Sequence, residues 1–211
     1  KPVTKEDYRL VTSPAWSPDS EYIVARKHFT SRRSIGSGEM WLYHRSGRGK
    51  GGQMTKKKTE QKDEGEPVFS PDRRYLYYSR DVSSGATFRY GKNSAEGIYA
   101  IERLDTTTGR VVRVAGGPGG AARPTPSPDG RWLAFIRRIE GRTALVLQNL
   151  RNGAEETLLH PIERDLQETW AIHGVYPTMS FTPDSKSIVL WSGGTLHRVR
   201  LRDAKRSAIP F

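Results

Sequence analysis

Residues 123–138 read RPTPSPDGRWLAFIRR, and close copies of this stretch occur at three other places in the chain. The copies are SPAWSPDSEYIVARKH (13–28), EPVFSPDRRYLYYSRD (66–81) and PTMSFTPDSKSIVLWS (177–192). Aligned on the aspartate of the Pro-Asp pair, they place Asp19, Asp72, Asp129 and Asp184 at intervals of 53, 57 and 55 residues. This regular period indicates a tandem array of similar structural units.

Each Ser/Thr-Pro-Asp corner predicts a tight turn between two strands. Proline presets φ for the second position of a type I turn, and the aspartate can accept hydrogen bonds from nearby backbone N–H groups. We therefore assign the four aspartates a structural role in turns, in preference to a metal-binding or catalytic one. The runs that follow, YIVA, YLYY, WLAF and IVLW, are short and apolar, which is typical of strands buried on both faces. Before the turn stand Trp16, Phe69, Pro126 and Phe181. The proline predicts weaker packing of that strand in the third copy.

Two further strands follow in every repeat. The third strand is expected at 39–45, 97–104, 143–150 and 195–201, and the fourth at 53–55, 110–115, 155–159 and 207–210. Four antiparallel strands repeated in tandem are typical of the blades of a β-propeller. The sequence therefore predicts an all-β fold, a propeller segment of about four antiparallel four-stranded blades.

The phase of the repeat sets the expected boundaries within a single segment, 1–211. The blades are expected at 11–58, 59–117, 118–160 and 161–211. Residues 1–10 are expected to form the outer strand of a preceding blade, because PVTK (2–5) matches QMTK (53–56). This strand, added to four blades of four strands, gives one strand more than a closed four-bladed ring needs. We therefore expect the chain to be part of a larger propeller of six or seven blades.

Composition limits the partners. The 211 residues include 35 Lys+Arg and 23 Asp+Glu, a net charge of +12, which would favour an acidic ligand or protein surface. The basic residues are not gathered in one patch, since the run 56–58 is followed by four acids, and this argues against specific nucleic-acid binding.

Without cysteine, disulfides and thiolate metal sites are excluded. No apolar run approaches the length of about 20 residues that a membrane helix needs.

Long connections are expected to gather on one face. They are 29–38, 56–66, 81–96, 115–123 and 160–176. Because long loops concentrate function, and Arg, Trp and Tyr anchor interfaces, we interpret this rim as a docking face. Its candidate interaction residues are Arg32, Arg33, Arg89, Tyr90, Arg123, Arg164, Glu168, Trp170, His173 and Tyr176. For Trp170 and Tyr176 an alternative is open, that they close the loop over the core.

Catalytic signatures are not found in the sequence. The five histidines form no H-x-H or H-E-x-x-H pair, and no G-x-S-x-G elbow is present. His173 could join Asp165 and Glu168 around a metal only if its loop folded back. Gly47, Gly49 and Gly52 match G-x-G-x-x-G, but they lie between two predicted strands with no helix to receive a phosphate. No catalytic, metal-binding or cofactor-binding residue is therefore assigned to this segment.

The Ser-Pro-Asp-(Gly)-x-aromatic-Leu/Ile pattern, preceded by proline and an aromatic residue, resembles the TolB-type propeller repeat of exported bacterial proteins. The likeness covers the whole chain. Three stretches, 22–47, 116–130 and 163–178, also resemble the propeller part of large bacterial proteins that join TolB-like blades to a metal-dependent amidohydrolase domain.

These resemblances imply a non-catalytic scaffold or interaction segment of a larger exported, periplasmic or secreted hydrolase. It would brace the catalytic domain or gate access to it, and any divalent metal would belong to that separate domain. The partner would be the catalytic domain of the same parent chain, another protein or an acidic ligand. Two alternatives stay open: a free-standing TolB-like periplasmic protein-binding module, or the propeller lid of a prolyl-peptidase-type serine hydrolase.

Overall fold

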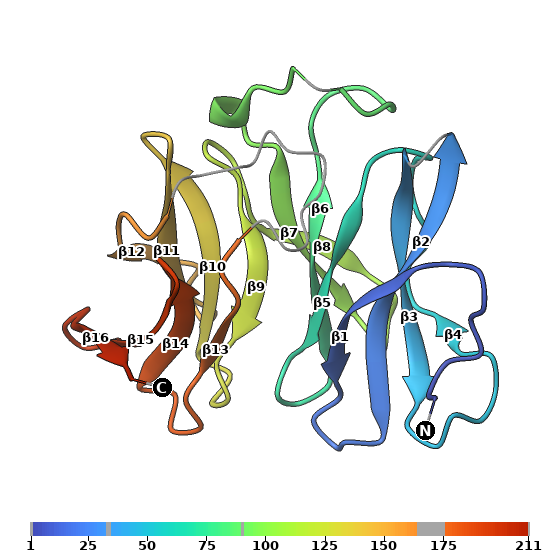
Figure 1. The fold of residues 1–211 in the computed structure, drawn as a ribbon, viewed down its shortest axis with the longest axis horizontal. Helices are drawn as coiled ribbons and strands as arrows, with labels where there is room; N and C mark the ends of the chain where they lie inside the picture. Colours follow the sequence, from blue (N-terminus) through green and yellow to red (C-terminus); the bar gives the residue numbers. More distant parts are fainter. Residues whose placement is uncertain (1, 33–34, 90, 164–175, 211) are drawn as a thin grey trace.

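The computed structural model describes residues 2–32, 35–89, 91–163 and 176–210. Over these ranges the chain forms four antiparallel sheets of four strands, and in each sheet the strands pair in chain order. The sheets stand side by side and fan out from a common centre (Figure 1). The predicted all-β propeller arrangement of four blades is therefore confirmed.

The strand bounds follow the repeat. Blade 1 contains β1 (Val11–Trp16), β2 (Tyr22–Arg32), β3 (Ile35–His44) and β4 (Gly52–Gln53). Blade 2 contains β5 (Glu64–Phe69), β6 (Tyr75–Asp81), β7 (Tyr99–Asp105) and β8 (Val111–Ala115), with a short 3₁₀ turn, η1 (Ser94–Glu96), before β7. Blade 3 contains β9 (Ala122–Pro126), β10 (Trp132–Ile139), β11 (Arg142–Asn149) and β12 (Glu155–Leu159). Blade 4 contains β13 (Met179–Phe181), β14 (Ser187–Ser192), β15 (Thr195–Arg200) and β16 (Arg206–Ile209).

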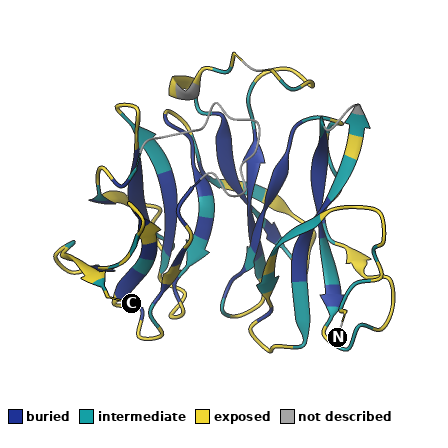
Figure 2. Cartoon of the chain, in the orientation of Figure 1, coloured by how far each residue is buried: buried dark blue, intermediate teal, exposed yellow. Residues whose placement is uncertain are grey.

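Apolar side chains fill the layers between neighbouring blades. The strands that carry them are coloured as buried over much of their length in Figure 2. In β6, Leu76 and Tyr78 pack towards blade 1 against Val24, whereas Tyr77 packs towards blade 3 against Phe135. Because successive side chains of a strand point to opposite faces, a strand between two blades must be apolar on both. This explains why the second strand of each repeat is a continuous apolar run.

The first and last blades each leave one face without a neighbouring blade. Phe69 and Phe181 face the preceding blade and are buried, but Trp16 at the same position of blade 1 is 56% exposed. On blade 4, Trp191 is 50% exposed and pairs across the strands with the exposed Leu196. Both faces carry the residue types that pack between blades elsewhere in the fold.

The prediction of a loop at 29–38 is wrong, because most of this range belongs to β2 and β3. β2 and β3 continue through it as a paired hairpin, with Thr30 opposite Gly36. The glycines that suggested a loop serve close packing instead. A Cβ on Gly38 would lie 2.6 Å from Arg26 Nε and closer still to the carbonyl oxygen of Glu64, so only glycine fits in the strand there.

Residues 2–10 differ from the expected outer strand, since none of them is in a strand. They run across the outer face of blade 1 (Figure 1). Glu6 pairs with Lys27, the Arg9 guanidinium lies 4.9 Å from the Phe29 ring, and the Leu10 carbonyl accepts a hydrogen bond from His28 N (2.9 Å). A strand needs a neighbouring strand as a hydrogen-bonding partner, and these residues contact side chains and the end of β2 instead.

Candidate interaction face

The connections between strands differ in length on the two faces of the fan. One face, which we call the long-loop face, carries the connections 54–63, 82–98 and 116–121 (Figure 1). The opposite face carries the short turns 17–21, 70–74, 127–131 and 182–186, and also the connection 45–51 between β3 and β4. Long connections on one side of a rigid scaffold are a common location for binding residues.

The four turn aspartates lie on the short-turn face, where their carboxylates bond within the turn. In each turn a Ser or Thr hydroxyl donates to the aspartate Oδ1, which also accepts the backbone N–H two residues further on. The hydroxyl pairs are Ser17–Asp19 (2.5 Å), Ser70–Asp72 (2.5 Å), Ser127–Asp129 (2.6 Å) and Thr182–Asp184 (2.6 Å). The hydrogen bonds from Ser17 and Thr182 hold the pKa of Asp19 and Asp184 below the usual range. Such internally bonded carboxylates match the needs of turn geometry.

The candidate rim residues fall into three groups. Arg89 is exposed in the 82–98 connection. Arg123, expected in a loop, lies in β9, and Tyr176 is only 5% exposed within the apolar layer between blades 3 and 4. Of the two roles considered for Tyr176, its burial favours packing. Arg32 is the last residue of β2, and the structure describes its backbone only. The remaining candidates lie outside the described residues: Arg33, Tyr90, Arg164, Glu168, Trp170 and His173.

The first strands of the four blades surround a central hollow of about 330 Å³. In three of them the residue six before the turn aspartate has a positive φ and precedes a proline. These residues are Ser13 (φ 51°), Glu66 (φ 56°) and Arg123 (φ 59°). The ladder register shifts beside each, as in a β-bulge. Non-glycine residues rarely adopt this conformation, and bulges commonly redirect side chains near functional sites.

The buried Glu66 and the half-buried Arg123 form an ion pair across blades 2 and 3 in this hollow. Arg123 Nη2 lies 3.2 Å from Glu66 Oε1, and the Arg123 N–H donates to Glu66 Oε2 at 2.9 Å. Ser79 Oγ also donates to Glu66 Oε2 (2.8 Å). Burial raises the pKa of Glu66, and the Arg123 charge opposes that rise. The pair therefore fixes the two inner strands relative to each other and gives the hollow a polar wall.

Arg26 and Asp63 connect blades 1 and 2 near the long-loop face. Arg26 Nη2 lies 2.6 Å from Asp63 Oδ1, which also accepts hydrogen bonds from the backbone N–H groups of Gly38 (2.9 Å) and Glu64 (3.0 Å). Arg26 Nε donates to the Glu64 carbonyl at 3.1 Å. The sequence interpretation did not identify this cluster. Its only local signal is the acidic run directly before a predicted strand, in 63–66.

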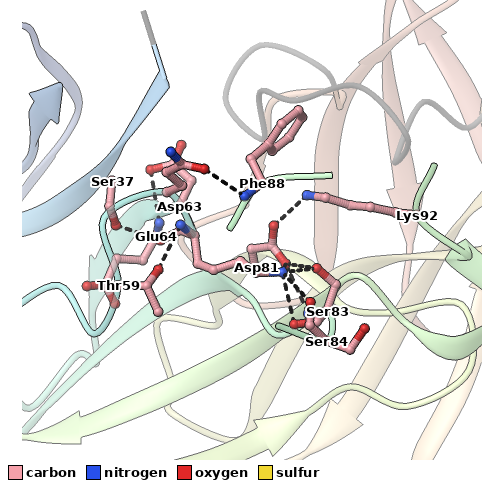
Figure 3. A network of polar contacts seen from close by, with 11 residues as sticks. Ser37, Thr59, Asp63, Glu64, Asp81, Ser83, Ser84, Phe88 and Lys92 are labelled. Carbon is pink, nitrogen blue, oxygen red and sulfur yellow. Dashed lines mark hydrogen bonds and ion pairs between the residues drawn. The ribbon is translucent and has the colours of Figure 1, made fainter. Parts of the chain in front are cut away.

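A second buried polar network lies at the base of the 82–98 connection (Figure 3). Asp81 accepts hydrogen bonds from Lys92 Nζ (2.5 Å) and from Ser83 Oγ (2.6 Å), and it lies 3.5 Å from Lys62 Nζ. Lys62 also donates to the carbonyls of Ser83 (2.9 Å) and Ser84 (3.2 Å). These bonds tie the connection to the segment that leads into β5.

The described residues place charged side chains on a rigid scaffold, as the Glu66–Arg123 and Arg26–Asp63 pairs show. Among the described residues, no group of three or more His, Asp or Glu side chains is placed to hold a metal ion. Within the same ranges, no helix has the length and apolarity needed to cross a membrane. The arrangement can therefore contribute recognition through charged side chains held on a rigid scaffold.

No family model matches the sequence, and no curated protein matches it. Solved structures do share the fold. TolB from Acinetobacter baumannii is 20% identical, with a TM-score of 0.63 over 95% of this chain and 43% of that one. A puromycin-hydrolyzing peptidase of Mycobacterium tuberculosis is 16% identical, with a TM-score of 0.65 over 95% of this chain and 29% of that one. The tricorn protease is 13% identical, with a TM-score of 0.63 over 95% of this chain and 22% of that one.

These likenesses show a TolB-like β-propeller fold. The chain spans less than half the length of the three structures. At such identities the likeness concerns the fold alone, because one propeller scaffold serves many unrelated functions. It does not bear on an attached amidohydrolase domain.

Proposed function

We propose that this chain is a non-catalytic interaction segment of a larger β-propeller, and that it docks a partner through the long-loop face. The observation that carries the proposal is the difference between the two faces. The four Ser/Thr-Pro-Asp turns of one face are short and internally hydrogen-bonded, whereas the other face carries the long connection 82–98 with the exposed Arg89. Exposed arginine on a rigid scaffold suits an acidic protein surface or ligand.

A propeller of six or seven blades accounts for the two blade faces, one on blade 1 and one on blade 4, that have no neighbouring blade among the described residues. Trp16 on blade 1 and Trp191 on blade 4 are half exposed, although both lie on blade faces. Exposed apolar faces of this kind commonly mark contact surfaces. Further blades packed against them would bury both side chains as Phe69 and Phe181 are buried here.

For the parent protein, we propose an exported, periplasmic or secreted hydrolase of the amidohydrolase type, in which this segment braces or gates the catalytic domain. The support is the sequence resemblance of 22–47, 116–130 and 163–178. In that arrangement a divalent metal belongs to the separate catalytic domain. The partner is that domain, another protein or an acidic ligand, and neither nucleic acid nor a membrane is required.

Two other arrangements follow from the repeat pattern of the sequence: a free-standing TolB-like periplasmic module and the propeller lid of a prolyl-peptidase-type serine hydrolase. The fold likeness to TolB and to a puromycin-hydrolyzing peptidase is compatible with both and does not choose between them. The sequence of the parent gene outside residues 1–211 separates the three. H-x-H motifs support the amidohydrolase arrangement, G-x-S-x-G supports the peptidase, and neither motif supports the free module.

The docking face is tested by reversing the charge of Arg32 and Arg33. The matched control reverses two exposed arginines on the opposite face, Arg110 and Arg151. Binding is measured by calorimetry against the separately expressed remainder of the parent protein and against a polyglutamate peptide. We expect the first double variant to bind more weakly with unchanged unfolding behaviour. Equal affinities in the two double variants would reject the docking face.

A further inference from the structure

The 82–98 connection encloses a pocket of about 340 Å³, and Arg89 of the proposed docking face is one of its lining residues. Its walls are almost entirely polar or charged, and Gly91 and Gly97 contribute backbone without a side chain. The lining includes Ser83, Ser84, Arg89, Gly91, Lys92 and Asn93. A hollow of this size can accept a small molecule or the end of a side chain.

Two lysine side chains are buried beside this pocket. The side chains of Lys62 and Lys92 are 3% and 2% exposed, and both ammonium groups contact the carboxylate of Asp81. Figure 3 shows the contact between Lys92 and Asp81. Lys92 itself lines the pocket, and its Nζ lies 4.5 Å from the centre of the Phe88 ring. Buried cations are normally paired one to one with acids, so two lysines on one carboxylate leave a positive excess.

Arg89 adds a third positive charge. It lines the pocket and, among the described residues, has no acidic partner. Burial lowers the pKa of Lys62, and repulsion from Lys92 and Arg89 lowers it further while Asp81 opposes the change. The acid of the pocket lining is Glu96, which accepts a hydrogen bond from Asn93 Nδ2 (3.0 Å), whereas Asp81 and Lys62 lie beside the pocket and not in its lining. The lining therefore holds two cations, Arg89 and Lys92, and one carboxylate, and counting Lys62 and Asp81 beside it gives three cations and two carboxylates.

We propose that this pocket binds a small oxyanion, a carboxylate or phosphate group, between Arg89, Lys92 and Ser84. The planar guanidinium of Arg89 can donate two parallel hydrogen bonds to two oxygens of such a group. The Lys92 ammonium supplies charge from the buried side, and the exposed hydroxyl of Ser84 supplies a neutral donor. The ligand would neutralise the excess charge without disturbing the Asp81 contacts.

The test titrates the 211-residue chain with succinate, with inorganic phosphate and with chloride at matched ionic strength. Backbone amide shifts of Ser83, Ser84, Gly91 and Asn93 are followed by nuclear magnetic resonance. We expect saturable shifts at these amides with succinate, phosphate or both, and none that saturate with chloride. A response to one oxyanion alone identifies the source as carboxylate or phosphate.

The exposed Arg89 allows a variant that leaves the core intact. Arg89→Gln should weaken binding by about tenfold, as loss of a charge-assisted pair predicts. Arg110→Gln, an exposed arginine on the opposite face, should bind like the unaltered chain. The proposal fails if no pocket amide saturates, if chloride gives the same shifts, or if Arg89→Gln binds with unchanged affinity. The inference rests on the proposed function to the extent that the pocket shares Arg89 with the docking face, and the Arg32 and Arg33 variants test that face separately.

Discussion

Replacing Glu64 by glutamine should change how the stability of the chain depends on pH. Glu64 is 2% exposed at the start of β5, and its Oε1 is buried without a hydrogen-bond partner among the described residues. It lies opposite Arg80 in the ladder, but Arg80 Nη1 is bonded to Glu102 at 3.0 Å. Burial raises the pKa of Glu64 from 4.5 to about 8, and Arg80 only partly opposes the rise. The ionised form of Glu64 is therefore destabilising in the folded state.

The direction in which the free energy of unfolding changes with pH follows from the raised pKa of Glu64. A group whose pKa is higher in the folded than in the unfolded state contributes most to stability at low pH, and that contribution falls as pH rises. For a pKa of about 8 in the folded state and 4.5 in the unfolded state, the free energy of unfolding falls by about 4 kcal/mol between pH 5 and pH 9. Glu64→Gln removes this pH-dependent decrease in the free energy of unfolding. Any destabilisation caused by burying the amide itself is the same at pH 5 and pH 9.

The assay is urea unfolding followed by tryptophan fluorescence at pH 5, 7 and 9. We expect the stability of Glu64→Gln relative to the unaltered chain to increase steadily with pH. The control is Glu156→Gln, which removes one negative charge at an exposed position of β12. That variant should show a constant difference. If the Glu64→Gln difference is also constant from pH 5 to pH 9, the reasoning about this buried carboxylate is wrong.

Two further substitutions test the packing and the turns. Gly38→Ala should lower the free energy of unfolding by about 1–3 kcal/mol, the usual cost of overpacking, because the new Cβ meets Arg26 and the Glu64 carbonyl. Gly52→Ala, with no neighbouring atom within 4 Å, should have little effect, and equal losses would contradict the close approach. Ser17→Ala should cost about 1 kcal/mol in urea unfolding, because the Ser17 hydroxyl donates to Asp19 and accepts the Tyr22 N–H at 2.9 Å. An unchanged midpoint would show that the hydroxyl does not stabilise the turn.

The blades could be predicted from the sequence because each level of information agreed. The Ser/Thr-Pro-Asp corner, the apolar run after it and the period near 55 residues all indicate the same hairpin. The continuous apolar pattern of YLYY and WLAF indicated burial on both faces, and Tyr77 and Tyr78 do pack towards opposite blades. Local chemistry and the repeat were sufficient for this part of the fold.

The hairpin of β2 and β3 was missed because glycine has two uses. Gly36 and Gly38 resemble turn residues in the sequence, but their role depends on atoms of Arg26, Phe29 and Glu64 that approach the strand. At Gly36 the approach comes from the paired strand β2, and at Gly38 it also comes from Glu64 of the next blade, so neither can be recognised before the strands are paired and the blades are packed. The same reasoning applies to the bulges at Ser13 and Glu66, for which the following proline was the available signal.

The buried charges were missed for a related reason. Arg26 and Asp63 are 37 residues apart, and the sequence gives no reason to pair them. Charged residues are usually exposed, so the acids of 63–66 were expected in a surface loop. Their burial follows from the fan of blades, which brings the end of one repeat against the start of the next.

The central claim is that successive sheets stand side by side around one centre, one repeat apart. Two backbone amides report this directly: Arg123 N lies 2.9 Å from Glu66 Oε2, and Asp129 N lies 3.1 Å from Ser185 Oγ. Nuclear Overhauser spectra of the isotopically labelled chain should show cross-peaks from these amide protons to the side chains of Glu66 and Ser185. Spectra that contain the cross-peaks within each sheet but lack both of these would contradict the propeller arrangement.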